Sequence, residues 1–65
     1  MNNPSVYVLI PLTDQCKEWI ASNLSYESWQ LIGDGIAIEH RYIDDVIALL
    51  QKFGNILGVD FRVTS

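Results

Sequence analysis

The single cysteine and the single histidine are the side chains of this 65-residue chain best suited to nucleophilic or acid-base chemistry. Cys16 lies near the start of a predicted helix, where the helix dipole lowers the pKa of a thiol. It also belongs to the apolar stripe of that helix, so we interpret it as a buried core thiol. His40 is predicted to end a strand antiparallel to the one that precedes Cys16, which separates the two by about 15 to 20 Å. A catalytic Cys-His pair is therefore not expected.

Acidic residues close to His40 suggest a metal or acid-base site. Glu39 and Arg41 flank the histidine in the sequence, and Asp44 and Asp45 follow. In a strand, Glu39 and Arg41 project to the face opposite His40. The two aspartates are explained by a role at the positive end of a second helix, which either of them can cap. We therefore predict no catalytic residue, metal ligand or cofactor, and do not expect an enzyme.

Residues 29–42 form two apolar, alternating runs separated by Asp34-Gly35. An Asp-Gly pair in this setting predicts a type I′ hairpin, with Gly35 in the left-handed region and a first strand over Tyr26–Ile32. No helix follows the turn, so it is not a phosphate loop. The expected pairs on the core face are Gly33 with Ile36, Leu31 with Ile38, and Trp29 with His40.

Two helices and two further strands surround this hairpin. The apolar run Val6–Ile10, closed by Pro11, predicts a central strand. Thr13 is the expected N-cap of a helix that runs to about Asn23. The apolar stripe of this first helix is Cys16, Trp19, Ile20 and Leu24.

The second helix begins at Asp44 or Asp45, and either Gly54 or Gly58 ends it. Its apolar stripe is Val46, Leu49, Leu50, Phe53 and Leu57. The last strand alternates between apolar Val59, Phe61 and Val63 and polar Asp60, Arg62 and Thr64.

The order strand, helix, hairpin, helix, strand resembles the ferredoxin-like βαββαβ fold. The resemblance covers Val6–Thr64 and implies an α+β domain, in which two helices cover one face of a four-stranded antiparallel sheet. We predict one small domain over residues 1–65, with residues 1–4 as a flexible N-terminal arm. The fold alone implies no function.

Charge and length narrow the function classes. Eight acidic against four basic residues give a net charge of -4, which argues against nucleic acid as a partner. The chain has no run long enough to span a membrane and no basic n-region of a secretory signal, so we expect a cytoplasmic protein. A core of this size supports about 3 to 5 kcal/mol of stability, and a single cysteine can form no disulfide within the chain. Self-association is therefore a serious possibility.

The first strand reads Val-Tyr-Val-Leu-Ile-Pro-Leu and resembles the first-strand motif of RNA-recognition domains. That resemblance implies that Tyr7 stacks on a base. The matching third-strand motif is missing, because Ala37 and Glu39 stand where such domains carry aromatic residues. Arg41 is the only basic residue that flanks them. RNA binding is therefore only a minor alternative.

The open face of the predicted sheet remains as the candidate site. If Val6, Val8 and Ile10 face the helices, Tyr7 and Leu9 lie outward at the centre of an apolar surface with a polar rim, which is typical of an interface. The predicted interface consists of Tyr7, Leu9, Ile32, Ala37, Glu39, Arg41, Asp60 and Arg62.

We expect a non-catalytic interaction or regulatory module that forms a homodimer or binds a small protein partner through this face. The alternative is a domain that senses a small molecule. Its ligand would lie at the Pro11–Asp14 loop near the Asp34-Gly35 turn, or at the seam of a dimer.

Overall fold

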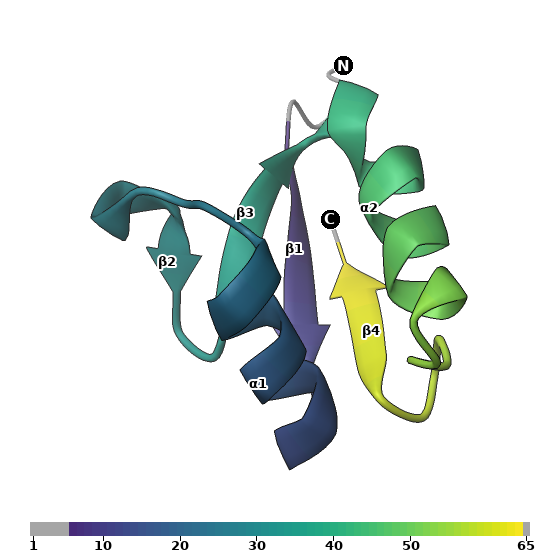
Figure 1. Ribbon diagram of the computed structural model, residues 1–65. Coiled ribbons are helices and arrows are strands. Elements are labelled where there is room, and N and C mark those ends of the chain that lie inside the picture. Colours follow the sequence, from purple (N-terminus) through teal and green to yellow (C-terminus); the bar gives the residue numbers. More distant parts are fainter. Residues whose placement is uncertain (1–5, 65) are drawn as a thin grey trace.

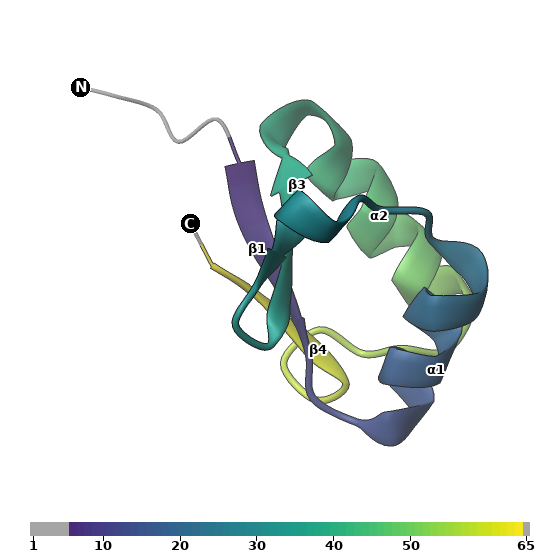
Figure 2. The same ribbon diagram turned by 90° about the vertical axis from the view of Figure 1, so that its left-hand side faces the viewer.

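The computed structural model describes residues 6–64, and the predicted arm at residues 1–4 lies outside them. Four antiparallel strands form a sheet in the order β2-β3-β1-β4, and Figure 2 shows both helices on one side of it. This is the predicted ferredoxin-like α+β layout. The elements in chain order are β1 (Val6–Pro11), α1 (Asp14–Asn23), the 3-10 helix η1 (Ser28–Gln30), β2 (Leu31–Ile32), β3 (Gly35–Glu39), α2 (His40–Lys52) and β4 (Phe61–Thr64) (Figure 1).

Helix α1 begins and ends where the sequence predicts. Thr13 is its N-cap, and the Cys16 backbone N–H donates to Thr13 Oγ1 at 3.3 Å. Cys16 and Ile20 are buried, while Trp19 and Leu24 pack against the core from partly buried positions. The predicted apolar stripe is confirmed.

Helix α2 begins at His40, four residues before Asp44, so the prediction that Asp44 or Asp45 caps it is wrong. Glu39 precedes the helix as its N-cap residue without a side-chain capping bond. The helix starts early because its buried stripe includes Ile43, which comes before both aspartates. The buried and partly buried apolar residues of α2 are Ile43, Val46, Ile47 and Leu50.

Gly54 ends α2 and decides between the two predicted stops. Its φ of 91° lies in the left-handed region. The Gly54 N–H donates to the Gln51 carbonyl at 3.1 Å, and the Asn55 N–H donates to the Leu50 carbonyl at 3.0 Å. These two bonds form a Schellman motif. The predicted stripe is wrong at three residues, because Phe53 and Leu57 beyond the helix are 56% and 46% exposed and Leu49 within it is 38% exposed.

The β2-β3 hairpin exists, but its loop lies one residue earlier than predicted. Ile32 pairs with Gly35, so Gly33 and Asp34 are the two loop residues. Gly33 has a φ of 57°, whereas Gly35 is not among the residues with positive φ, so the predicted left-handed Gly35 is wrong. A glycine with positive φ at the first loop position is typical of a type II′ turn.

Strand β2 is much shorter than the predicted Tyr26–Ile32. Residues 28–30 form η1 instead, and the Glu27 backbone N–H donates to Gln30 Oε1 at 2.7 Å. Trp29 and His40 lie in helices and do not form the predicted cross-strand pair. The local hydrogen bond within residues 27–30 satisfies backbone groups that a strand would have paired with β3.

Strand β1 lies centrally, as predicted, but with its faces exchanged. Leu9 pairs with Ile36 of β3 and with Val63 of β4, and it is fully buried in the core. Tyr7 pairs with Ile38 and therefore shares the helix-covered face with Leu9. The prediction that Tyr7 and Leu9 point outward is wrong. Because every residue of Val6–Ile10 is apolar or aromatic, alternation within β1 could not select its buried face.

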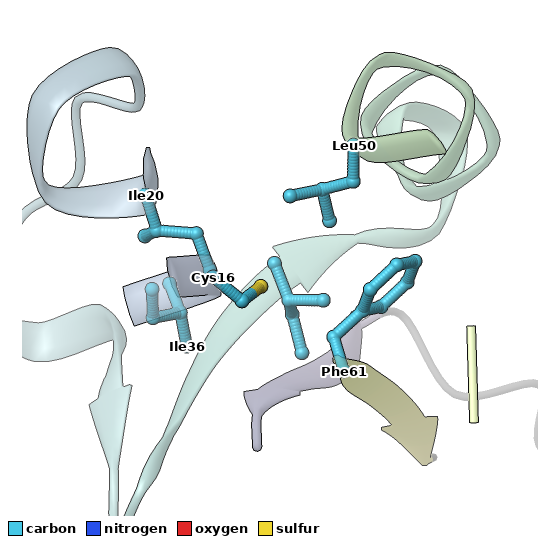
Figure 3. Close-up of a cluster of buried hydrophobic side chains, with 6 residues drawn as sticks. Cys16, Ile20, Ile36, Leu50 and Phe61 are labelled. Carbon is cyan, nitrogen blue, oxygen red and sulfur yellow. The ribbon is translucent and has the colours of Figure 1, made fainter. Parts of the chain in front are cut away.

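The core lies between the sheet and the two helices. Figure 3 shows side chains from α1, α2, β3 and β4 converging on one cluster. Phe61 is fully buried, whereas Val59 is 60% exposed and precedes the strand, so β4 is shorter than the predicted alternation. The buried cluster consists of Leu9, Cys16, Ile20, Ile36, Leu50 and Phe61.

Candidate functional site

The face of the sheet away from the helices carries the middle of β1. Gly35 belongs to this face, since a Cβ there would meet Val8 Cγ1 at 2.4 Å and Ile10 Cγ1 at 3.0 Å. Val8 and Ile10 are half-buried, and Ala37 is 5% exposed. We call this surface the open face, and it consists of Val6, Val8, Ile10, Ile32, Gly35, Ala37, Glu39, Arg62 and Thr64.

Four of the eight predicted interface residues lie on the open face. Ile32 is 50% exposed in the edge strand β2, and Ala37 pairs with Val8 of β1. Glu39 and Arg62 are exposed at its rim. The other four do not. Tyr7 and Leu9 lie on the helix-covered face, Arg41 lies in α2, and Asp60 lies in the loop before β4.

Glu39 and Arg41 form an ion pair at the start of α2. Arg41 Nη2 and Nε each lie 3.2 Å from Glu39 Oε2. The Arg41 guanidinium carbon also lies 5.2 Å from the ring centroid of Tyr42. Both charged side chains are more than half exposed, so the pair contributes little to stability.

Asp60 was predicted at the interface rim, but it is only 9% exposed. Thr13 Oγ1 donates to Asp60 Oδ1 at 2.9 Å, and the Ile56 N–H donates to Asp60 Oδ2 at 2.8 Å. The Asp60 carbonyl accepts from the Leu12 N–H at 2.7 Å. Asp60 therefore joins the start of α1 to the loop before β4. It is a structural residue, because the turn before Phe61 directs its carboxylate inward.

Cys16 is fully buried within the core cluster. Burial raises the pKa of its thiol, and the Asp60 carboxylate adds to the increase. This is the reverse of the lowered pKa that a reactive cysteine needs. His40 is exposed at the first position of α2 and does not belong to the core cluster. The surroundings of Cys16 within residues 6–64 therefore favour the neutral thiol over the thiolate.

Residues 6–64 contain no cluster of metal ligands and no helix that could span a membrane. In that part of the chain, no three His, Cys, Asp or Glu side chains group together as ligands of a metal ion. Neither α1 nor α2 is long and apolar enough to cross a membrane.

A cavity of about 280 Å³ lies beside the second half of β3, where the predicted β2 would have continued. Tyr26, Trp29 and Tyr42 contribute aromatic rings to its wall, and Ile38 contributes apolar surface. Glu39 is the one charged side chain among its described lining residues. We call this space the aromatic cavity.

The departure of η1 from the sheet creates the aromatic cavity. Gln30 Nε2 donates to the Ala37 carbonyl at 2.9 Å, so a side chain replaces the backbone donor of a longer strand. Sequence reasoning missed this site because it assigned residues 26–30 to β2. The available signal was the Glu27-x-x-Gln30 spacing, which is typical of a helical turn with a capping bond.

Comparisons with protein-family models, curated proteins and solved structures give no match to this chain.

Proposed function

We propose that this protein is a non-catalytic cytoplasmic interaction module that forms a homodimer through the open face of its sheet. The observation that carries the proposal is the apolar row of Val6, Val8 and Ile10 on the central strand, on the face opposite both helices. An apolar centre with exposed charges at its rim is typical of protein interfaces. A single buried thiol fits the reducing environment of the cytoplasm.

The shape of the open face favours a second sheet as its occupant. Gly35 and Ala37 lie beside Val8 and Ile10, so the middle of the surface has no large projecting side chain. Two such sheets can pack face to face at about 10 Å separation. A second copy of the chain supplies the same flat apolar surface, and burying it would support a core whose central cluster has six buried residues within residues 6–64.

The charges at the rim complement each other under two-fold symmetry. Glu39 pairs with Val6, whereas Arg62 pairs with Ile10, so they lie at opposite ends of β1 and on opposite sides of it. A two-fold axis in the plane of the interface, perpendicular to the line joining them, places Glu39 of each copy opposite Arg62 of the other. Such pairs add little affinity but help to set the orientation.

Light scattering and sedimentation of the purified protein test the proposal. We expect a dimer at micromolar concentration, and Val8→Lys should convert it to a monomer because two ammonium groups cannot be buried in an apolar seam. Val59→Lys is the matched control, since Val59 is 60% exposed in the loop before β4 and lies outside the open face. A wild type that stays monomeric at high concentration would contradict the proposal.

A charge exchange tests the orientation separately. Glu39→Arg and Arg62→Glu should each weaken the dimer, because each places like charges opposite one another. The double variant should recover most of the wild-type affinity. If the double variant dimerises no better than the worse of the two single variants, the proposed symmetry axis is wrong.

Sensing of a small molecule is the second candidate function, and the aromatic cavity favours it. The ligand position expected from the sequence, near the loop after β1, has two hollows of about 180 Å³ and about 420 Å³, which share Pro11, Lys17 and Asp34. The aromatic cavity is more enclosed than either hollow, and three aromatic residues line it. A rise in melting temperature with added ligand measures such binding directly.

A further inference from the structure

The composition of the aromatic cavity restricts the ligand that it can hold. Its volume of about 280 Å³ is close to the lower end of the range for small-molecule pockets, so it fits a small organic molecule. Its aromatic rings come from Trp29 in η1, Tyr42 in α2 and Tyr26 in the loop before η1. Such rings carry negative potential on their faces. Because Glu39 supplies the only charge among the described lining residues, both features favour a cation.

Arg41 shows that a cation is already stabilised at the rim of the cavity. Its guanidinium contacts two lining residues, Glu39 at 3.2 Å and the ring of Tyr42 at 5.2 Å from the centroid. The Arg41 side chain is 66% exposed and is not a lining residue. The Arg41 side chain can therefore move into solvent when another cation binds Glu39, and only a weak surface ion pair is lost.

We propose that the aromatic cavity binds a small organic monocation, whose apolar body lies among Tyr26, Trp29 and Tyr42 and whose ammonium group pairs with Glu39 in place of Arg41. This inference deepens the second candidate function by naming its ligand class, and it does not depend on the dimer. The net charge of -4 attracts such a ligand over a longer range.

Three probes of matched size test the charge preference. They are 2-phenylethylammonium, 2-phenylethanol and 3-phenylpropanoate, titrated into isotopically labelled protein and followed by the amide shifts of residues 37–42 and the indole N–H of Trp29. We expect the ammonium probe to bind about five- to tenfold more tightly than the alcohol. We expect the carboxylate to bind most weakly.

Two substitutions distinguish the roles of the charged side chains. Glu39→Gln should reduce the preference for the ammonium probe over the alcohol to the part that the aromatic rings provide, while Glu18→Gln on the exposed side of α1 should leave it unchanged. Arg41→Gln should strengthen ammonium binding about two- to fivefold, because the competing guanidinium is removed. Lys17→Gln is its control, since it makes the same change in net charge at an exposed residue of α1 that does not line the cavity.

Each outcome supports or overturns the inference. Equal binding of ammonium and alcohol, or tighter binding of the carboxylate, overturns the cation class while leaving small-molecule sensing in place. Weaker ammonium binding by Arg41→Gln overturns the competition step. If none of the three probes shifts the resonances, both the inference and the sensing function at this cavity fail, whereas the dimer proposal is unaffected.

Discussion

Cys16 and Asp60 are linked through a single threonine at the start of α1. Thr13 Oγ1 accepts a hydrogen bond from the Cys16 N–H at 3.3 Å and donates one to Asp60 Oδ1 at 2.9 Å. The thiol is thus surrounded by the apolar core. The helical turn that carries it is hydrogen-bonded, through Thr13, to the Asp60 carboxylate. Both surroundings favour the neutral thiol over the thiolate.

This environment makes part of the stability depend on pH. Because the pKa of Cys16 is raised on folding, the unfolded chain releases the thiol proton at a lower pH than the folded chain does. The contribution is fully present below the unfolded pKa of about 8.5 and is lost as pH rises toward the folded pKa. Relative to Cys16→Ala, the wild type should lose up to about 1.4 kcal/mol of unfolding free energy per pH unit in that range.

Urea unfolding at pH 7 to 10 measures this difference. Tyrosine and lysine titrations occur in both proteins and largely cancel in the comparison. A constant difference between wild type and Cys16→Ala over the whole range would show that the folded thiol is solvated. Rapid reaction of the native protein with an aromatic disulfide at neutral pH would lead to the same conclusion.

The conformation and packing of the β2-β3 hairpin depend on two glycines with different roles. Gly33 provides the positive φ of the loop, and no atom lies within 4 Å of the place of its missing Cβ. Gly35 has ordinary backbone geometry, but a Cβ there would meet the Leu9 carbonyl oxygen at 3.1 Å and Val8 Cγ1 at 2.4 Å. One glycine makes the turn, and the other lets β3 pack closely against β1.

Gly35→Ala should therefore destabilise the protein through crowding, by about 1 to 3 kcal/mol. Val8→Ala in the same chain should recover part of this loss, giving a favourable coupling of about 1 kcal/mol in a double-mutant cycle measured by urea unfolding. Gly33→Ala is the control, since its cost of about 1 to 2 kcal/mol comes from backbone strain and should not couple to Val8. If Gly33→Ala couples to Val8→Ala and Gly35→Ala does not, the result would favour the turn at residues 34–35 that the sequence predicts.

Helices and strands differed in how far the sequence could predict them. Thr13 supplies a local cap and Gly54 a local stop, so these helix boundaries depend on residues a few positions apart. The register of β3 against β1 depends on contacts between residues far apart in the chain, and an all-apolar strand carries no pattern to select its face. The start of α1 was therefore predictable and the end of α2 was narrowed to two glycines, while the orientation of Leu9 was not predictable.

The candidate site was predictable to the same limited extent. Alternation in the hairpin placed Ile32, Ala37 and Glu39 on the open face, and alternation in the last strand placed Arg62 there. Val8 and Ile10 were missed because β1 has no polar side. The aromatic cavity was missed because it exists only where the chain leaves the sheet, at a 3-10 turn that β-propensity does not predict.

At the scale of the whole molecule, apolar side chains are divided between a small core and the surface. The open face is one apolar surface, and a second group of exposed apolar residues follows α2. This group comprises Phe53, Ile56, Leu57 and Val59. A ring contact between Trp19 and Phe53, with centroids 5.6 Å apart, attaches the start of this segment to α1. The open face differs from this segment because it lies on the central, hydrogen-bonded strands of the sheet, which favours it as the proposed dimer seam.

If the dimer supports the fold, thermal stability must depend on protein concentration. A unit that binds only the folded state stabilises it by mass action, so the melting temperature of the wild type should rise as its concentration increases from micromolar to millimolar. Val8→Lys, as a monomer, should melt at a lower temperature that does not change with concentration. Val59→Lys should keep the concentration dependence, because its side chain lies outside the seam. Scanning calorimetry of the three proteins measures this directly, and a concentration-independent wild type would show that the core of one chain is sufficient for its stability.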